Sequence, residues 1–295
     1  MPSPCVLETR TGTPAYLGGW LPPRTAWGRG RDALGRLAVR TFKRGVARVF
    51  RRELAALGAR EVYREDGSEH VYSDERILAL GAPELELERG DWPACLEWIG
   101  PVTASFGPPS TKPPLRSGRR RVLVSLGTHL GWAESGAIER ATDLAERLPD
   151  WDVHVTLGRS RLGSSPRASK QETAPPPNLA VLDYVAYDQH LEAYDVAVVH
   201  GGTGVTYACL ERAVPILVWP HDYDQFDHAA RLLHRGLAQP FPKTGADAAR
   251  AVVEASAPST TRIEFARLLA RYDPVRAVGE CLSAVDACGR SRASR

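Results

Sequence analysis

The sequence is poor in several features that would have assigned it to a class at once. Its net charge is only +3, which is too small to argue for nucleic-acid binding by itself. Its five cysteines are odd in number and show no Cys-x-x-Cys spacing (Cys5, Cys95, Cys209, Cys281 and Cys288). This pattern speaks against a disulfide framework or a zinc site, and we expect free thiols in a reducing compartment.

Long apolar runs and several well-known motifs are also missing. No apolar stretch approaches the ~20 residues that a membrane helix needs, and the opening MPSPCVLETR lacks the character of a signal peptide. There is no P-loop, GxGxxG, HExxH or GxSxG motif, so the chemistries that depend on these motifs are excluded. We expect a cytoplasmic protein that has no metal site.

What is present is an ordinary globular composition with one composition break. Apolar residues make up 43% and charged residues 25% of the 295 positions, enough for one large or two medium domains. The segment 107–118, GPPSTKPPLRSG, is rich in Pro, Gly and Ser and reads as a linker. We therefore divide the chain into an N-terminal domain at 1–106, the linker at 107–118, and a C-terminal domain at 119–295.

Apolar runs and helical periodicities alternate after the linker. This alternation predicts an α/β domain that is doubly wound around a parallel sheet. The expected strands are 121–127, 152–157, 179–182, 196–199 and 216–219, and the expected helices are 133–148, 204–213, 225–235, 245–256 and 261–285, the last one broken at Pro274.

A basic amphipathic segment precedes the linker. Residues 31–57 carry apolar positions at helical spacing, and arginine and lysine crowd the remaining face. Two interpretations remain open. The helix either belongs to the N-terminal domain with a solvated basic face, or it contacts anionic lipid peripherally at the inner membrane face.

The most informative stretch runs from Asp195 to Gly236. Its glycines, a histidine and an acid–amide pair fall in the turns after two expected strands, where an open α/β sheet binds ligands. The pattern consists of His200-Gly201-Gly202-Thr203-Gly204, Ala213-Val214-Pro215, and Pro220 followed by Asp224-Gln225.

This pattern resembles the donor-binding signature of GT-B glycosyltransferases, in particular the UDP-glycosyltransferase and macrolide glycosyltransferase group. The resemblance is sharp over 121–240 and vague over 1–100. It implies a GT-B fold, with a complete Rossmann-like C-terminal donor-binding domain after a partial N-terminal acceptor domain. It also implies an enzyme that uses a nucleotide sugar as co-substrate and needs no other cofactor.

Donor chemistry explains why these residue types recur together. A helix N-terminus offers unsatisfied N–H groups and a positive dipole end to a diphosphate, and glycines let the backbone approach it. A tight strand–helix turn alone is the structural alternative. By resemblance, the diphosphate-binding residues are His200, Gly201, Gly202, Thr203, Gly204, Val205 and Thr206, together with Ser125, Gly127 and Thr128.

The resemblance assigns two further groups of residues. Asp224 and Gln225 match the pair that binds the hydroxyls of the transferred sugar, although an aspartate here is also typical of a helix N-cap. Tyr184 and Val185 match the segment that packs on the nucleobase, with ordinary core packing as the alternative. Asp222 and Asp224 share one turn, where acidic residues are more often solvated than bound to a metal.

The sequence also departs from the family in ways that leave parts of the function open. The ribose-binding glutamate of plant members is replaced by Ala208, and the asparagine that often follows Asp-Gln is replaced by His228. UDP and dTDP are therefore not distinguished. The first βα units and the usual catalytic histidine have no counterpart, since no histidine precedes His70, and the acceptor base is not identified.

We therefore expect an inverting, metal-independent glycosyltransferase. It would move a hexose from a UDP- or dTDP-sugar to a hydroxyl of a lipophilic natural-product or lipid acceptor. The alternative is a donor-binding half that is inactive alone and needs a partner chain to supply the missing N-terminal half. A sugar-nucleotide epimerase of the same fold is a third interpretation.

Overall fold

The computed structural model describes Leu7, 13–56, Gly58, 61–65, 68–103, 112–128, 130–158 and 174–293, with side chains to residue 283. The chain forms two compact units, one of Met1–Pro101 with Tyr272–Arg295 and one of Val102–Arg271. Part of the expected linker, 107–111, lies outside the described residues. Cys95, Cys209 and Cys281 are free thiols, while Cys5 and the side chain of Cys288 also lie outside them.

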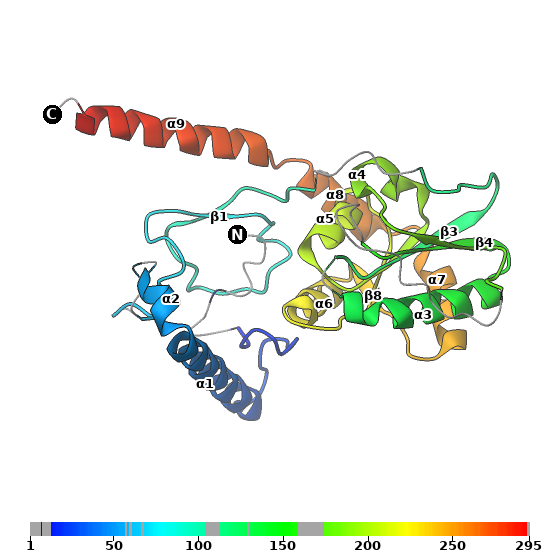
Figure 1. The fold of residues 1–295 in the computed structure, drawn as a ribbon, viewed down its shortest axis with the longest axis horizontal. Coiled ribbons are helices and arrows are strands. Elements are labelled where there is room, and N and C mark those ends of the chain that lie inside the picture. The colour runs from blue at the N-terminus through cyan, green and yellow to red at the C-terminus, as the bar shows by residue number, and fades with distance from the viewer. Residues whose placement is uncertain are drawn as a thin grey trace. The chain divides into compact units, whose positions relative to one another are not determined.

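The unit Val102–Arg271 is built on a six-stranded parallel sheet (Figure 1). Its strands lie in the order β5-β4-β3-β6-β7-β8. Counted within this unit, the order is 3-2-1-4-5-6, that of a doubly wound nucleotide-binding sheet. The α/β prediction is confirmed. The bounds are β3 Arg120–Ser125, β4 Trp151–Thr156, β5 Leu179–Leu182, β6 Val196–Val199, β7 Ile216–Val218 and β8 Ala238–Pro240.

Helices cover both faces of this sheet (Figure 1). Helix α3 (Glu134–Arg147) contacts α7 (Gly245–Ala255) on one face, and α5 (Thr203–Glu211) contacts α8 (Thr260–Leu269) on the other. Helix α6 (Gln225–His234) packs beside β8. Short helical turns complete the unit at η2 Gly131–Ala133, α4 Tyr187–His190 and η3 Leu191–Ala193.

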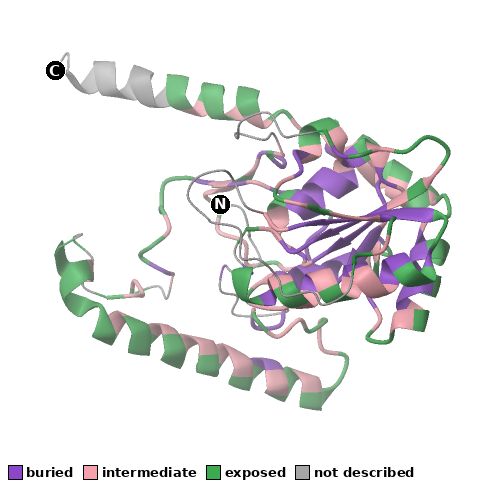
Figure 2. Cartoon of the chain, turned by 45° about the vertical axis from the view of Figure 1, so that its right-hand side comes forward, coloured by how far each residue is buried: buried purple, intermediate pink, exposed green. Residues whose placement is uncertain are grey.

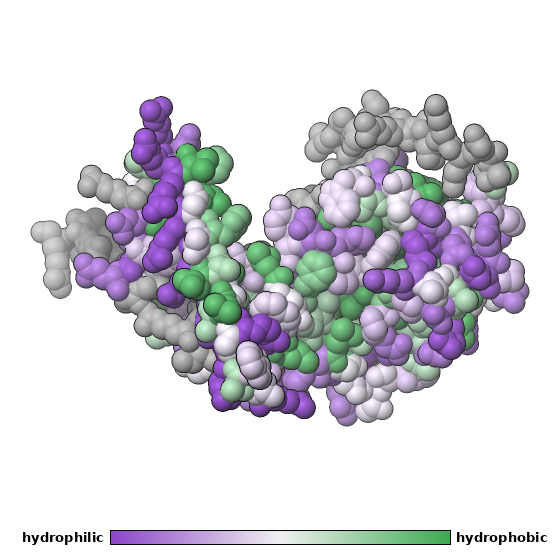
Figure 3. Space-filling view, turned by 90° about the horizontal axis from the view of Figure 1, so that it is seen from below, coloured by the Kyte–Doolittle hydropathy of each residue, from purple (hydrophilic) through white to green (hydrophobic). Residues whose placement is uncertain are grey.

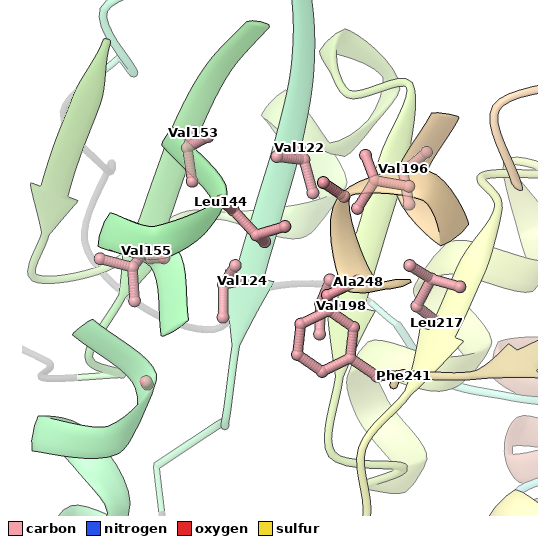
Figure 4. Packing of buried hydrophobic residues seen from close by; sticks show 14 of the residues in the cluster. Val122, Val124, Leu144, Val153, Val155, Val196, Val198, Leu217, Phe241 and Ala248 are labelled. Carbon is pink, nitrogen blue, oxygen red and sulfur yellow. The ribbon is translucent and has the colours of Figure 1, made fainter. Parts of the chain in front are cut away.

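The main core lies between the sheet and the helices α3 and α7 (Figure 4). Val122 and Val124 of β3 point toward Leu144 of α3, while Leu123 between them is equally inaccessible on the opposite face. Strands buried on both faces explain the continuous apolar runs in the sequence. Alanines dominate the α7 side of the core, including Ala248, and their small size lets the helix lie close to the sheet.

The described residues of the second unit include a short parallel strand pair and the helices α1, α2 and α9. Strand β1 (Ile77–Ala79) pairs with β2 (Leu96–Trp98). Helix α1 (Ala26–Val49) begins where the Thr25 hydroxyl accepts from Gly28 N–H, so the expected helix 31–57 starts earlier. It is followed by α2 (Arg51–Ala56), and the unit ends with α9 (Pro274–Ala293).

The C-terminal segment groups with the first hundred residues, although the sequence division put it in 119–295. Tyr272 packs on Gly100, where a Cβ atom would overlap the tyrosine and where φ is +87°. The Tyr272 hydroxyl donates to Glu84 at 3.0 Å. The break expected at Pro274 is confirmed, since α8 ends at Leu269 and α9 begins at Pro274, a position that proline favours in a helix.

Helix α1 uses part of its basic side within its own unit and also exposes its apolar side. Lys43 pairs with buried Glu69 at 2.6 Å, and Arg40 and Arg44 lie over the ring of Tyr63. Other basic side chains, such as Arg48, are exposed, so the basic face is solvated only in part. The apolar side is exposed as well: Trp27, Leu34, Leu37, Phe42 and Val49 are each more than half exposed.

The figures show how much of α1 is exposed. Most of α1 is exposed or intermediate in Figure 2, with one buried position at Asp32. Hydrophobic side chains lie at the surface beside hydrophilic ones in the left-hand part of Figure 3. Within the described residues, no helix has the length and apolar character needed to cross a bilayer.

Candidate functional site

The expected site residues gather at the edge of the sheet where the strands end. Register places the ends of the strands side by side, since Ser125 of β3 pairs with Thr156 of β4 and with Val199 of β6, and Val199 pairs with Val218 of β7. From β3 the chain continues to β4 and β5 on one side of the sheet, and it then returns to β6, β7 and β8 on the other side of β3. Such a switch point opens a crevice at the carboxyl ends of the strands.

His200 lies at this edge of the sheet. It follows β6, is half-buried, and its Nδ1 is 3.4 Å from the carbonyl oxygen of Ser125. Two glycines make room for its ring: a Cβ at Gly127 would lie 2.7 Å from Cε1, and a Cβ at Gly202 would overlap Nε2. Gly127 also has a φ of +70°, which disfavours any side chain. These four residues therefore form one close-packed cluster across two strands.

Ser125 supports this cluster with its side chain. Its hydroxyl is inaccessible and lies 2.6 Å from the hydroxyl of Tyr187, and it accepts from Gly127 N–H at 3.4 Å. The ring of Tyr187 is partly exposed, but burial of its hydroxyl end raises the pKa of Tyr187 to about 12. Ser125 thus shapes the Gly127 turn, while Thr128 beyond it is exposed.

The N-terminus of α5 lies at the same edge of the sheet. Gly202 is the N-cap and supplies no side chain to cap the helix, and Thr206 N–H makes a helical bond to Gly202 O at 3.1 Å. The N–H groups of Gly204 and Val205 therefore have no acceptor within the helix. Gly204 is exposed, with no atom within 4 Å of a Cβ placed there. This geometry suits an anion.

Thr206 is placed differently from Thr203. Thr206 is inaccessible, and its hydroxyl has no hydrogen-bond partner among the described residues. The side chain of Val205 is also buried. Thr203 is half-buried, and its hydroxyl lies 3.5 Å from His228 Nε2. Among the threonines of this helix, Thr203 is thus the one on the accessible side.

Asp224 stands at the start of α6. It occupies the N-cap position, yet its side chain makes no capping hydrogen bond. Its Oδ2 lies 3.5 Å from Nε2 of His228, one turn along α6, and His228 is 2% exposed. Thr203, Asp224 and His228 therefore connect the starts of α5 and α6.

Gln225 is buried and uses its carbonyl oxygen within the protein. Oε1 accepts from His221 N–H at 2.9 Å and from Asp222 N–H at 3.1 Å. The backbone of Gln225 also lies against Gly201, where φ is +91° and a Cβ would lie 3.0 Å from Gln225 O. Because the carbonyl is engaged, the NH₂ group is the part of this side chain suited to a ligand.

The residues expected near a nucleobase follow β5. Val185 is 1% exposed, so its side chain belongs to the core, whereas Tyr184 remains half-buried. Just before them, the carbonyl oxygen of Asp183 accepts from the Thr156 hydroxyl at 3.5 Å. This bond ties the loop after β5 to the end of β4.

An aromatic row beside α6 was missed from the sequence. Trp219 packs on Phe241 and on His221, and His221 meets Trp132 edge to face. Desolvation lowers the pKa of His221. Trp219 and Phe241 directly follow β7 and β8, and this was the signal in the sequence. The contact between Trp132 and His221 could not be predicted, because these residues are far apart in the chain. Among the described residues, no three His, Cys, Asp or Glu side chains cluster closely enough to hold a metal ion.

The chain has relatives among known proteins. No protein-family model matches the chain. It is 26% identical to 4'-demethylrebeccamycin synthase of Lentzea aerocolonigenes over 95% of this chain and 66% of that protein. It is 29% identical to sterol 3-beta-glucosyltransferase of Saccharomyces cerevisiae over 50% of this chain and 13% of that protein.

A solved structure of the kitacinnamycin glycotransferase superposes with a TM-score of 0.62 at 27% identity, covering 90% of this chain and 67% of that one. The chain thus spans less than two thirds of the length of the rebeccamycin and sterol relatives, at 66% and 13%. Its α/β fold with a parallel sheet matches theirs. The homologues and structural neighbours of this chain are GT-B glycosyltransferases of the macrolide and UDP-glycosyltransferase group.

Proposed function

We propose that this chain is a glycosyltransferase that binds a nucleotide diphosphate sugar at the carboxyl edge of its six-stranded sheet and transfers the hexose. One observation carries the proposal: His200 and the open N-terminus of α5 meet at the switch point between β3 and β6. A histidine beside uncapped N–H groups at a helix start is well suited to a diphosphate.

The order of the groups along the edge supports a nucleotide sugar over a simple phosphate. Tyr184 follows β5, Ser125 and His200 end β3 and β6, and Asp224 follows β7. This order repeats that of base, diphosphate and sugar in the ligand. From β5 to β7 the sheet has four interstrand steps, or about 19 Å at ~4.8 Å each, a span suited to an extended nucleotide sugar.

The proposed reaction is an inverting displacement. The acceptor hydroxyl attacks the anomeric carbon, the bond to the diphosphate oxygen breaks, and negative charge grows on the leaving diphosphate. Donors already aimed at that oxygen would each contribute about 3 kcal/mol if they tighten in the transition state. We propose that His200 and the first N–H groups of α5 fill this role without a metal. The base that takes the proton of the acceptor is not assigned.

The acceptor class is inferred from the relatives. They include a sterol 3-beta-glucosyltransferase and a 4'-demethylrebeccamycin synthase, which favours a hydroxyl of a lipophilic natural product or lipid as the acceptor. UDP and dTDP both remain candidates, because Ala208 stands where plant members have the ribose-binding glutamate. The side chain of Ala208 is a methyl group that is 1% exposed, and it offers no polar group to the ribose.

A second candidate is a donor-binding half that needs a partner chain. Its support is that α1 leaves an apolar side uncovered, with Trp27 91% and Val49 76% exposed. Under this proposal, the purified chain binds the nucleotide but transfers no sugar to any hydroxylated acceptor. Transfer by the chain alone would exclude it.

Peripheral contact of residues 31–57 with the inner membrane face is a further proposal. The exposed apolar side of α1 supports it, while the internal contacts of Lys43 and Arg40 remove part of the basic face that would attract lipid. Sedimentation with phosphatidylserine vesicles, compared for the parent and Phe42→Glu, tests the idea. Equal sedimentation of both proteins would contradict a lipid contact made by the apolar side of α1.

The central experiment is calorimetric titration of UDP and dTDP into the purified chain and its His200→Ala variant. We expect one nucleotide to bind the parent, and at least tenfold weaker binding to the variant, which corresponds to ~1.4 kcal/mol. Circular dichroism of both proteins establishes that they are folded. A folded parent that binds neither nucleotide would overturn the proposed function.

A further inference from the structure

Four aromatic side chains form a continuous row that joins the start of α6 at Gln225. Ring centroids are 5.4 Å apart between Phe241 and Trp219, 4.5 Å between Trp219 and His221, and 5.9 Å between His221 and Trp132. Phe241 is buried at one end, whereas Trp132 is 66% exposed at the other. The row therefore runs from the core to the surface and ends on an accessible indole.

Two connections place this indole at the candidate site. On one side, His221 N–H donates to Oε1 of Gln225 at 2.9 Å, which joins the row to the start of α6. On the other side, Trp132 lies in η2, four residues after Thr128 in the loop that follows β3. The contact between Trp132 and His221 therefore bridges the loops that follow β3 and β7.

The chemistry of the row differs from that of its neighbours. The carboxylate of Asp224 and the NH₂ group of Gln225 suit hydroxyl groups, whereas an exposed indole offers a large apolar face. A hexose has both kinds of surface, since its hydroxyls project from a ring whose C–H groups form apolar faces. Binding sites for small ligands commonly combine aromatic walls with a few polar groups in this way.

We propose that Trp132 forms an apolar wall of the subsite for the transferred sugar, that His221 holds it in position, and that together they favour donors whose hexose can lie with a C–H face on the indole. This inference rests on the proposed function and extends it to the sugar. Trp132 is the contact residue, and His221 is a positioning residue that acts through Trp132.

The surroundings of His221 indicate that the shape of its ring is what matters. Its Nε2 is buried and has no hydrogen-bond partner among the described residues, so the imidazole offers an aromatic surface to Trp132 and Trp219 rather than a charge. A phenylalanine at this position keeps an aromatic surface. It also keeps the hydrogen bond to Gln225, because that bond comes from the backbone N–H. An alanine removes the aromatic surface.

The test compares the nucleotide diphosphate with its glucose conjugate by calorimetry. UDP, UDP-glucose, dTDP and dTDP-glucose are titrated into the parent, Trp132→Ala, Trp132→Phe, His221→Ala and His221→Phe. We expect the diphosphates to bind all five proteins within twofold. The glucose conjugate should bind at least fivefold more weakly to the two alanine variants, and with nearly parental affinity to the two phenylalanine variants.

Four results would overturn the inference. Equal affinity of the glucose conjugate for the parent and Trp132→Ala would contradict the role of Trp132 as a wall of the sugar subsite. If His221→Phe loses as much affinity for the glucose conjugate as His221→Ala does, the positioning role of His221 is contradicted. If the parent binds the diphosphate no less tightly than its glucose conjugate, and Trp132→Ala has the same affinities, the sugar subsite alone is contradicted. If the parent binds no nucleotide, the proposed function is contradicted as well.

Discussion

The carbonyl oxygen of Ser125 lies 3.4 Å from Nδ1 of His200, and the contact joins the ends of β3 and β6. It spans the point where the sheet changes winding direction. The ring of His200 is further confined by Gly127 and Gly202. Its position is therefore set by backbone on three sides, so small backbone changes should be felt directly in ligand binding.

Gly202→Ala should displace His200 without unfolding the protein. The added methyl group would overlap Nε2 of the ring, so the ring must move. We expect nucleotide binding to weaken at least tenfold (~1.4 kcal/mol), measured by titration. Gly45→Ala is the control, because no atom lies within 4 Å of its Cβ. It should leave binding unchanged and stabilise α1 by about 0.5–1 kcal/mol. Parental binding by Gly202→Ala would contradict the confinement of His200.

Gln225→Ala and Gln225→Glu separate two roles of one side chain. Alanine leaves the N–H groups of His221 and Asp222 without their acceptor, and we expect a loss of about 1–3 kcal/mol of unfolding free energy. Glutamate keeps an acceptor oxygen but removes the NH₂ donor. It should retain most of that stability while weakening the nucleotide sugar more than the nucleotide. Denaturant titration and calorimetry measure the two effects, and equal loss of stability in both variants would contradict this division.

His154 should make stability depend on pH. It is 1% exposed on β4, with Nδ1 2.9 Å from the Tyr194 hydroxyl. Desolvation lowers the pKa of His154, opposed in part by Asp152. Below the ordinary value of about 6.5, the unfolded chain takes up a proton that the folded chain resists. Stability should therefore fall as the pH falls below that value.

Chemical denaturation of the parent and His154→Gln at pH 7.5 and pH 5.5 tests this dependence. The variant has no imidazole at this position, so its loss of stability between the two values should be smaller than that of the parent. Identical losses would show that other groups account for the pH dependence.

Leu144 and Leu34 should respond to truncation according to their burial. Leu144 of α3 is completely inaccessible in the core, whereas Leu34 of α1 is 69% exposed. Leu144→Ala should cost about 2–5 kcal/mol, and Leu34→Ala should stay within about 0.5 kcal/mol. Thermal unfolding of both variants measures the contrast. A large loss for Leu34→Ala would show that the apolar side of α1 is covered in solution.

Much of the unit Val102–Arg271 was readable from local sequence. The run around Val122–Val124 predicts a doubly buried strand because both faces of a parallel sheet are covered. In the other unit, Pro274 predicts a break in the expected helix because of its fixed φ and missing N–H. The glycines next to His200 mark a turn and a site for the same kind of local reason, since their neighbours in the chain are also their neighbours in space.

Tertiary structure decided whatever depends on partners distant in the chain. The Ser125 hydroxyl is engaged by Tyr187, the row from Phe241 ends on Trp132, and Tyr272 packs on Gly100. The inward turn of the basic side of α1, toward Glu69 and Tyr63, is of the same kind. Composition and periodicity report the propensity and polarity of each residue along the chain. Which side chains meet is set by how the elements pack, and that is why the support of the site, unlike its glycine and histidine motif, emerged only from the fold.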